Sequence, residues 1–339
     1  MRVKYSRYAV ILAFSTALVC ILLLVWRSAP VPSEPPSGTD TGSVVYRIGV
    51  SFPMTDLMFR AKMLSLLEQY QQDHAGEVTF IIRDGQNSQR QQNQDLMELV
   101  DTPVDGIILI PYTMEGTLPV IQYANDKQIP VMTLDNRVED STPARVISYV
   151  GADHVQMGCL AAQLLVSALE RRFPEEQQWN VIYLTGIPNS AGAVDRDSGI
   201  KETLDQEPRI TLLGEFNGEF TRQKSCSIME DCLNIYPCIH GVICQNDLMA
   251  EGCYQALENY GLAGRVSIIG IDGQRSVVEK IAEQKIDGTI LQYPDMILHA
   301  VEYMRSYLNG QPLQYAYYQQ IDPITFENAQ ACLDAGLSW

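Results

Sequence analysis

GVICQNDLMA, at residues 241–250, and VSIIGIDG, at residues 266–273, are each a short apolar run that ends in Asn or Asp before a polar or glycine turn. Apolar runs of this length are typical of strands that are buried on both faces of a parallel sheet. The polar residues then lie at the carboxyl ends of adjacent strands. Open α/β sheets bind their ligands at that edge.

Asn246 and Asp272 are the polar residues that close these two runs. Amide and carboxylate groups in one crevice suit a ligand rich in hydroxyl groups, because each can accept from or donate to an OH. A sugar is the obvious candidate. Both residues can instead be helix N-caps, since Asn and Asp also cap the helix after a strand. The recurrence of the pattern along the chain favours a ligand site.

The rest of the chain alternates strands and helices in two series. The first predicts strands over 46–51, 78–82, 106–110 and 130–134 and helices over 59–72, 89–99 and 118–126. The second predicts strands over 180–184, 210–216 and 288–292 and around Val242 and Ile268, with helices over 155–172, 196–204, 223–234, 248–260, 277–284 and 296–308. Such series imply parallel sheets with helices on both faces. We therefore predict two doubly wound α/β units with a ligand cleft between them.

Length, charge and motifs limit the function. The 339 residues are enough for two ordinary domains, and the net charge of −17 argues against nucleic acid as a partner. The sequence contains no nucleophile elbow, no dinucleotide fingerprint and no phosphate loop, and its four histidines have no metal-ligand spacing. We therefore expect neither a catalytic site nor a cofactor nor a metal. The loop at 186–192 opens a helix, and either meets a polar ligand through backbone N–H groups or is an ordinary turn.

The N-terminus resembles a membrane anchor. Basic residues precede an apolar segment at 8–26, and Arg27 follows it. About 20 apolar residues span a bilayer, and positive charge before the segment keeps the N-terminus in the cytoplasm. We predict a cytoplasmic stub and transmembrane anchor over 1–27, which makes the protein single-pass in the cell membrane with an extracytoplasmic binding domain.

Residues 28–45 are rich in Pro, Ser, Gly and Thr, which predicts an extended tether. Two alternatives to an uncleaved anchor remain open. A signal peptidase can cut at Ser28-Ala29, although Arg27 stands where a small residue is wanted. A lipid can be attached at Cys20, although bulky residues precede it.

Seven of the eight cysteines lie outside the predicted anchor. There is no CxxC pair, so a zinc site is not expected. We interpret most of them as small buried apolar residues. A bridge between Cys232 and Cys238 is conceivable.

The order of motifs resembles the bacterial periplasmic sugar-binding proteins of the ribose- and galactofuranose-binding type. The resemblance runs from about Arg47 to the last residue. It rests on IGVS at 48–51, DGQN at 84–87, VDGIILIP at 104–111, IPVMTLD at 129–135, VDR at 194–196, EFTR at 219–222, QND at 245–247, IDG at 271–273 and QYP at 292–294. No single motif is specific, but their shared order is.

The resemblance implies two lobes joined by a three-segment hinge that close on one sugar. The N-lobe would comprise 46–150 plus 293–320, and the C-lobe 151–292 plus 321–339. Carried over by position, the residues that bind the sugar hydroxyls or cover its ring are Phe59, Arg60, Asp135, Asn136, Arg196, Phe220, Asn246, Asp272 and Gln292.

Two positions depart from the family pattern. Asn136 stands where the family has an arginine after Leu-Asp, with Arg137 one place further on. Val194 stands where the ribose-binding pattern has a contacting arginine, which makes ribose itself doubtful as the ligand.

We therefore predict a non-catalytic, membrane-anchored receptor for a monosaccharide, either a pentose or a hexose. The anchor favours signalling of occupancy to a sensor histidine kinase, and the alternative is the substrate-binding component of an ABC transporter with its permease as partner. A transcription regulator is excluded, because residues 1–45 hold no helix-turn-helix. A hydrolase that uses Asp135 and Asp272 is disfavoured, because no residue in the sequence is placed to tune their pKa values.

Overall fold

The computed structural model describes residues 45–140 and 143–339. The predicted anchor, nearly all of the tether and Cys20 lie outside the described residues. In the part of the chain that is described, no helix combines the length and the apolarity needed to cross a membrane.

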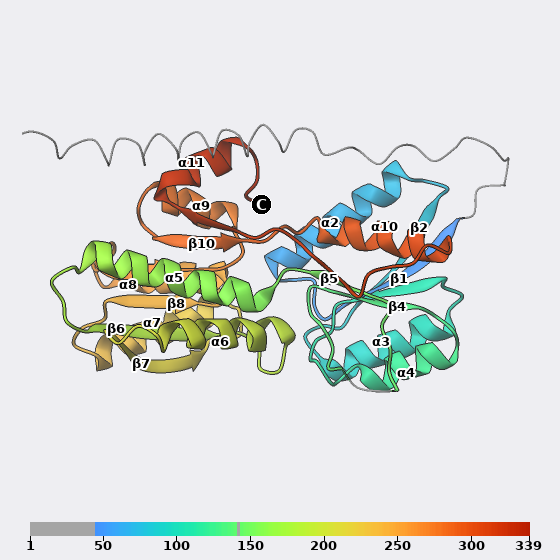
Figure 1. Ribbon diagram of the computed structural model, residues 1–339, viewed down its shortest axis with the longest axis horizontal. Coiled ribbons are helices and arrows are strands. Elements are labelled where there is room, and N and C mark those ends of the chain that lie inside the picture. The colour runs from blue at the N-terminus through green and yellow to red at the C-terminus, as the bar shows by residue number, and fades with distance from the viewer. Residues whose placement is uncertain (1–44, 141–142) are drawn as a thin grey trace, which may run out of the picture. The chain divides into compact units, whose positions relative to one another are not determined.

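The first sheet is entirely parallel and has the strand order β11-β5-β4-β3-β1-β2. Its strands are β1 (Tyr46–Phe52), β2 (Val78–Asp84), β3 (Gly106–Leu109), β4 (Val131–Leu134), β5 (Tyr149–Gly151) and β11 (Ala316–Tyr318). One face packs against α2 (Met58–Asp73) and α10 (Met296–Leu308), the other against α3 (Gln89–Asp101) and α4 (Leu118–Asp126) (Figure 1). We call this layered unit the first lobe.

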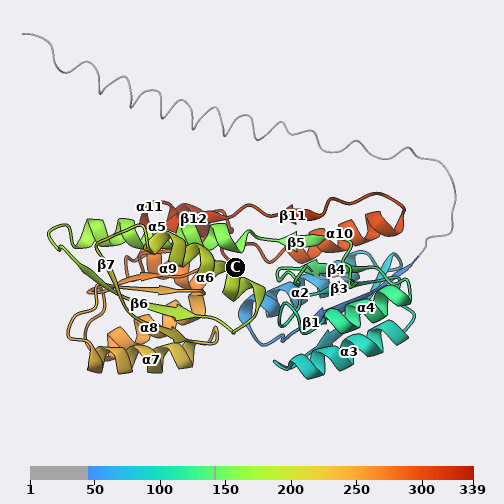
Figure 2. The ribbon, with the colours of Figure 1, turned by 60° about the horizontal axis from the view of Figure 1, so that its bottom comes forward.

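The second sheet has the order β12-β10-β9-β8-β6-β7. Its strands are β6 (Trp179–Thr185), β7 (Ile210–Asn217), β8 (Gly241–Cys244), β9 (Ser267–Ile269), β10 (Gly288–Leu291) and β12 (Asp322–Thr325). One face packs against α5 (His154–Arg172) and α6 (Ala191–Leu204), the other against α7 (Arg222–Ile235), α8 (Asp247–Asn259), α9 (Arg275–Ala282) and α11 (Phe326–Asp334) (Figure 2). This unit is the second lobe.

Alternation along the central strands explains why both faces of each sheet are covered. In β8, Val242 and Cys244 belong to the core under α7 and α8, while Ile243 belongs to the core under α5. Successive side chains of a strand point to opposite faces, so an uninterrupted apolar run supplies both cores. The prediction of an α/β protein with two parallel-sheet lobes is confirmed.

Polar residues at the strand–helix junctions determine where several helices begin. The side chains of Ser88, Asp153, Ser190 and Asn246 each accept a hydrogen bond from the backbone N–H three residues further on. Each thereby satisfies one of the free N–H groups in the first turn of a helix. The cap at Ser190 starts α6 at Ala191, so the predicted start at residue 196 was wrong by five residues.

The chain passes between the lobes three times, after β5, after β10 and after β11 (Figure 1). Strands β5, β11 and β12 and helix α11 were not predicted. The three strands have three or four residues each, too few to establish a period. Strand β12 pairs antiparallel with β10, so the second sheet departs at this edge from the predicted all-parallel arrangement.

All seven cysteines of the described residues are free thiols, so no bridge joins Cys232 to Cys238. Cys238 is exposed, whereas Cys232 is buried in the core of the second lobe. The interpretation as buried apolar residues is correct for four of the seven, which are Cys232, Cys244, Cys253 and Cys332.

Candidate ligand-binding site

The carboxyl ends of strands from both sheets line one cavity. It comprises about 650 Å³ of space between protein atoms, part of it open to solvent. All nine residues that the sequence predicted lie in its lining: Phe59, Arg60, Asp135, Asn136, Arg196, Phe220, Asn246, Asp272 and Gln292.

Two buried carboxylates face this cavity, one from each lobe. Asp135 follows β4 and Asp272 follows β9, and their side chains are 5% and 7% exposed. Both residues have a positive backbone φ, 60° for Asp135 and 135° for Asp272, which residues other than glycine rarely adopt. Such a backbone persists only where its surroundings hold it in place, and it is common in ligand sites.

Each carboxylate has an arginine beside it. The Nη2 atom of Arg60 lies 2.5 Å from Oδ2 of Asp135, and Nη2 of Arg196 lies 3.5 Å from Oδ1 of Asp272. Burial alone would raise the pKa of the Asp135 carboxyl, but Arg60, His154 and Arg196 together outweigh it, so this pKa lies well below its ordinary value. Asp135 is therefore an ionised acceptor at neutral pH.

Asp272 has a different electrostatic environment. Burial raises the pKa of its carboxyl to about 6, although Arg196 and a hydrogen bond from Gln292 pull it down. A second buried carboxyl, Asp247, lies nearby and accepts hydrogen bonds from the N–H groups of Gly273 and Gln274. Burial and the charge of Asp272 raise the pKa of Asp247. Asp247 thus holds the loop after β9 and is not part of the cavity lining.

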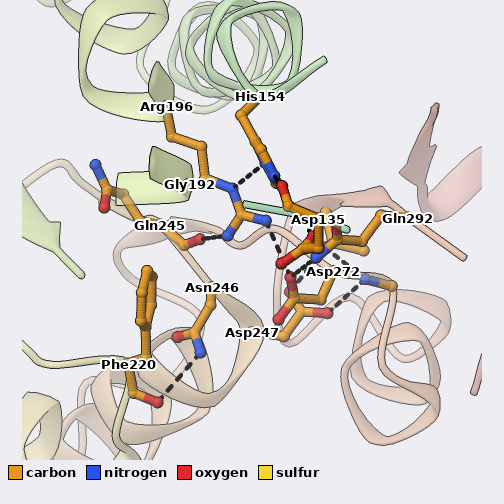
Figure 3. A network of polar contacts seen from close by, with 12 residues as sticks. Asp135, His154, Gly192, Arg196, Phe220, Gln245, Asn246, Asp247, Asp272 and Gln292 are labelled. Carbon is orange, nitrogen blue, oxygen red and sulfur yellow. Dashed lines mark hydrogen bonds and ion pairs between the residues drawn. The ribbon is translucent and has the colours of Figure 1, made fainter. Parts of the chain in front are cut away.

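Arg196 is fixed by three protein groups, as Figure 3 shows. Its guanidinium donates to the carbonyl oxygen of Gln245 at 2.6 Å and to Nδ1 of His154 at 3.3 Å, in addition to its pairing with Asp272. Nε2 of His154 in turn donates to the carbonyl oxygen of Asp135 at 2.9 Å. Arg196 therefore has a structural role as well as a place in the lining, and it links the two carboxylates through His154.

Three buried acceptors of the lining have no hydrogen-bond partner among the described residues. They are Oδ1 of Asp135, Oε1 of Gln274 and Oε1 of Gln292. The other side of the Gln292 amide is engaged, because Nε2 donates to Oδ1 of Asp272 at 2.7 Å. Buried polar groups are nearly always paired in folded proteins, so acceptors left free in a cavity indicate where a ligand donates.

Two phenylalanine rings line the same cavity. Phe59, at the start of α2, is 8% exposed and also belongs to the core of the first lobe, so it serves both purposes. Phe220 is half-buried in the loop after β7, and its ring lies against Gly186. A Cβ atom at position 186 would come within 1.9 Å of this ring, so any other residue there must displace the ring.

The two asparagines of the lining are largely occupied by the protein. Asn246 caps α8 by accepting from Met249 N–H, and it donates to the carbonyl oxygen of Phe220. The helix-cap alternative is thus correct for Asn246. Asn136 connects the lobes, because it donates to the carbonyl oxygen of Pro111 and accepts from the N–H of Gly192. The 186–192 loop thus reaches the cavity, where the backbone N–H of Gly192 donates to the side chain of Asn136.

Of the two departures from the family pattern, Asn136 lies in the lining, whereas Val194, like the neighbouring Arg137, lies outside it. Arg137 forms a bidentate ion pair with Asp195 of the second lobe. Its Nη2 lies 2.8 Å from Oδ1 and its Nε 3.0 Å from Oδ2. Val194 is exposed. The cationic side chains of the lining, leaving His154 aside, are therefore Arg60 and Arg196.

Sequence reasoning missed several residues of the lining, among them Tyr112, His154 and Gln274. Gln274 lies two positions after Asp272, in the same strand-end turn, and that proximity was a usable signal. His154 offered none, because it reaches Asp135 only when the start of α5 meets the end of β4.

The sequence and the fold are similar to those of known proteins. Residues 48–312 match the periplasmic binding protein domain family. The ribose import binding protein RbsB of Bacillus subtilis (strain 168) is 26% identical over 304 residues, 89% of this chain and 95% of that protein. The galactofuranose-binding protein YtfQ of Escherichia coli (strain K12) is 28% identical over 235 residues, 68% of this chain and 72% of that protein.

The fold also matches the fructose-binding periplasmic domain of a hybrid two-component system, with a TM-score of 0.77 and 23% identity over 86% of this chain and 97% of that one. All three proteins are named for binding and none for catalysis, which agrees with the prediction that this chain is not an enzyme. A match over residues 48–312 covers most of the sequence, and its motifs meet at one cavity. The chain belongs to the periplasmic binding protein domain family.

Proposed function

We propose that this protein binds a neutral monosaccharide, a pentose or a hexose, in the cavity between its lobes. The observation that carries the proposal is the set of three buried, unpartnered acceptors on Asp135, Gln274 and Gln292. A sugar presents several hydroxyl donors on a small rigid ring, and each can satisfy one such acceptor.

The charges of the lining support an uncharged ligand. Two arginines and two aspartates lie in it, and each arginine is placed beside one aspartate. An anionic ligand would need a cationic side chain that is not already paired with a carboxylate. A cationic ligand would need a carboxylate that is not already paired with an arginine. Phe59 and Phe220 add apolar faces that suit the C–H patches of a sugar ring.

We assign the nine predicted residues as ligand contacts of unequal weight. Asp135, Asp272 and Gln292 make the principal hydrogen bonds, and Phe59 and Phe220 cover the ring. The remaining four, Arg60, Asn136, Arg196 and Asn246, chiefly orient these groups, because most of their polar atoms already have protein partners. The relatives named for ribose, galactofuranose and fructose agree with this ligand class.

We further propose that the protein is an extracytoplasmic receptor whose lobes, 46–150 plus 293–320 and 151–292 plus 321–339, close on the sugar. An anchor over residues 1–27 would keep it at the membrane, where a sensor histidine kinase reads the closed state. A ligand that binds one state more tightly shifts the population towards it, and this supplies the signal. The second candidate is the substrate-binding component of an ABC transporter, favoured by the relative named for ribose import.

The first test is a thermal-shift screen of the full chain against ribose, xylose, arabinose, galactose, glucose and fructose. A sugar that binds only the folded state raises the melting temperature with its concentration, by about 2.7 kcal/mol of added stability at one hundred times its dissociation constant. We expect a clear shift with one or a few of them. A flat result across neutral sugars, together with a shift from an anionic metabolite, would overturn the proposal.

The partner is tested by cross-linking in membranes of the native host, with and without the sugar found in the screen. We expect ligand-dependent capture of a histidine kinase. Capture of a permease instead would assign the protein to transport.

A further inference from the structure

Trp339 holds the backbone of two residues of the site from outside the cavity. Its indole N–H is shared between the carbonyl oxygens of Asp272, at 3.1 Å, and of Gln292, at 3.0 Å. Its own carbonyl oxygen accepts from the N–H of Arg275 at 2.7 Å, which fixes residue 339 to the start of α9. Trp339 is half-buried and is not part of the cavity lining.

The ring of Trp339 reaches the other lobe as well. Its centroid lies 5.1 Å from that of Phe59, with the two planes tilted by 53°. Trp339 also packs against the hydrophobic cores of both lobes. One side chain therefore contacts a ring that lines the cavity in the first lobe and two carbonyl groups behind the cavity in the second.

The strained backbone of Asp272 explains why such a contact matters. Its φ of 135° is unfavourable for a residue with a side chain, so neighbouring groups must hold it. The counterpart in the first lobe is Asp135, whose carbonyl oxygen accepts from the hydroxyl of Tyr149 and from His154, both at 2.9 Å. The carbonyl oxygen of Asp272 accepts from the N–H of Gln292 at 3.1 Å and from Trp339.

We propose that Trp339 is a positioning residue of the ligand site. Its indole N–H holds Asp272 and Gln292 in the geometry that presents their side chains to the ligand, and its ring supports Phe59. Trp339 holds the carbonyl oxygen of Asp272 as Tyr149 and His154 hold that of Asp135. The inference rests on the proposed function, because it concerns the groups assigned there as sugar contacts.

The test compares two identical substitutions in the full chain. Trp339→Phe keeps an aromatic ring but removes the N–H. Trp179→Phe is the matched control, because Trp179 is fully buried in the same lobe, away from the cavity lining, and its indole also donates to a carbonyl oxygen, that of Phe173 at 3.2 Å. Calorimetric titration with ribose, arabinose, galactose and fructose measures the dissociation constant of each variant.

We expect both variants to melt at a lower temperature, and only Trp339→Phe to bind the sugar more weakly, by about tenfold. A second measurement needs no ligand. Hydrogen exchange should become faster at the amides of Asp272 and Gln292 in Trp339→Phe and stay unchanged there in Trp179→Phe. These amides donate to the carbonyl oxygens of Ile290 and Asp272, which hold the strained turn together.

Equal dissociation constants and equal exchange in the two variants would overturn the inference. If the unaltered chain binds no neutral sugar of the thermal-shift screen, the proposed function fails, but the comparison of hydrogen exchange in the two variants still tests the role of Trp339. Faster exchange confined to Trp339→Phe would then support its positioning role independently of the ligand.

Discussion

At the scale of single residues, the two aspartates of the cavity are the same residue type in different electrostatic states. The close arginine keeps Asp135 ionised, whereas burial with a more distant arginine raises the pKa of Asp272 to about 6. Around Asp272 stand Arg196, Arg60, Asp135 and Asp247, which together set this balance. Of the two aspartates that line the cavity, only Asp272 therefore changes its charge within the ordinary range of pH, while Asp247, outside the lining, has its pKa raised to about 8 by burial and by the charge of Asp272.

Sugar binding should weaken as the pH falls through about 6. Above this pH the Asp272 carboxylate accepts a ligand hydroxyl, and below it the protonated carboxyl has lost part of that capacity. The effect on folding has the opposite sign. A carboxyl whose pKa is raised from 3.8 to about 6 contributes stability that is present at low pH and lost as the pH rises through 6.

Asp272→Asn separates this group from the others that titrate. At pH 8 we expect the variant to bind sugar more weakly than the unaltered chain by about 1–3 kcal/mol, because a buried charged acceptor is lost. At pH 5 the two should bind alike. Asp231→Asn, on the exposed side of α7, is the control and should follow the unaltered chain at both pH values. An equal pH dependence in all three would remove Asp272 from the ligand contacts.

At the scale of elements, the loops after β6 and β7 depend on each other. Gly186 leaves room for the ring of Phe220, whose own φ is 60°. A methyl group at position 186 must displace the ring, since the loop backbone is held by Gly186 N–H, which donates to the side chain of Gln245 at 2.7 Å. The ring that covers one side of the cavity is thus positioned by the neighbouring loop.

Gly186→Ala should lower the affinity for the sugar by roughly 1–3 kcal/mol, the usual cost of overpacking, because Phe220 moves. Gly261→Ala is the control. Position 261 also needs glycine, with φ of 69°, but nothing lies within 4 Å of a Cβ atom there. Both variants should lose stability in thermal melts. A loss of affinity of the same size in both would show that general destabilisation, and not the position of Phe220, is responsible.

The sequence predicted these elements to different degrees. The strand that ends at Cys244 and the polar residues after it were predictable. Its apolar run indicates a strand buried on both faces, and the Asn and Asp that follow mark the carboxyl end of that strand. The short strands β11 and β12 were not, because they are defined by pairing with β5 and β10. His154 and Trp339 escaped for the same reason, since each acts through contacts with distant parts of the chain.

At the scale of the whole described chain, the lobes are tied together beside the cavity. Arg137 pairs with Asp195, Asn136 accepts from Gly192, and the N–H of Met114 donates to the carbonyl oxygen of Asn189. Each tie joins a loop of the first lobe to the 186–192 loop or to the first turn and a half of α6. These contacts exist only when the lobes are close, so they would stabilise the closed state that we propose.

Arg137→Gln should raise the dissociation constant by no more than about fivefold, because exposed ion pairs contribute up to about 1 kcal/mol. The loss should shrink at about 0.5 M salt, where the pair is screened in the unaltered chain as well. Titration at low and high salt measures both effects. Arg209→Gln, which breaks ion pairs with Glu207 and Glu170 inside the second lobe, should leave affinity unchanged. A salt response in Arg137→Gln equal to that of the unaltered chain would contradict the tie.

The passage of the chain from lobe to lobe also determines the order of folding during synthesis. Helix α10 gives Met296, Ile297, Ala300, Val301 and Met304 to the core of the first lobe, yet it follows nearly the whole second lobe in the sequence. A nascent chain that ends before residue 296 therefore leaves exposed the part of the first sheet's apolar face that α10 covers, although α2 is already in place. The lobe that is translated first can be completed only after most of the other has been made, and until then its uncovered apolar surface is prone to aggregation.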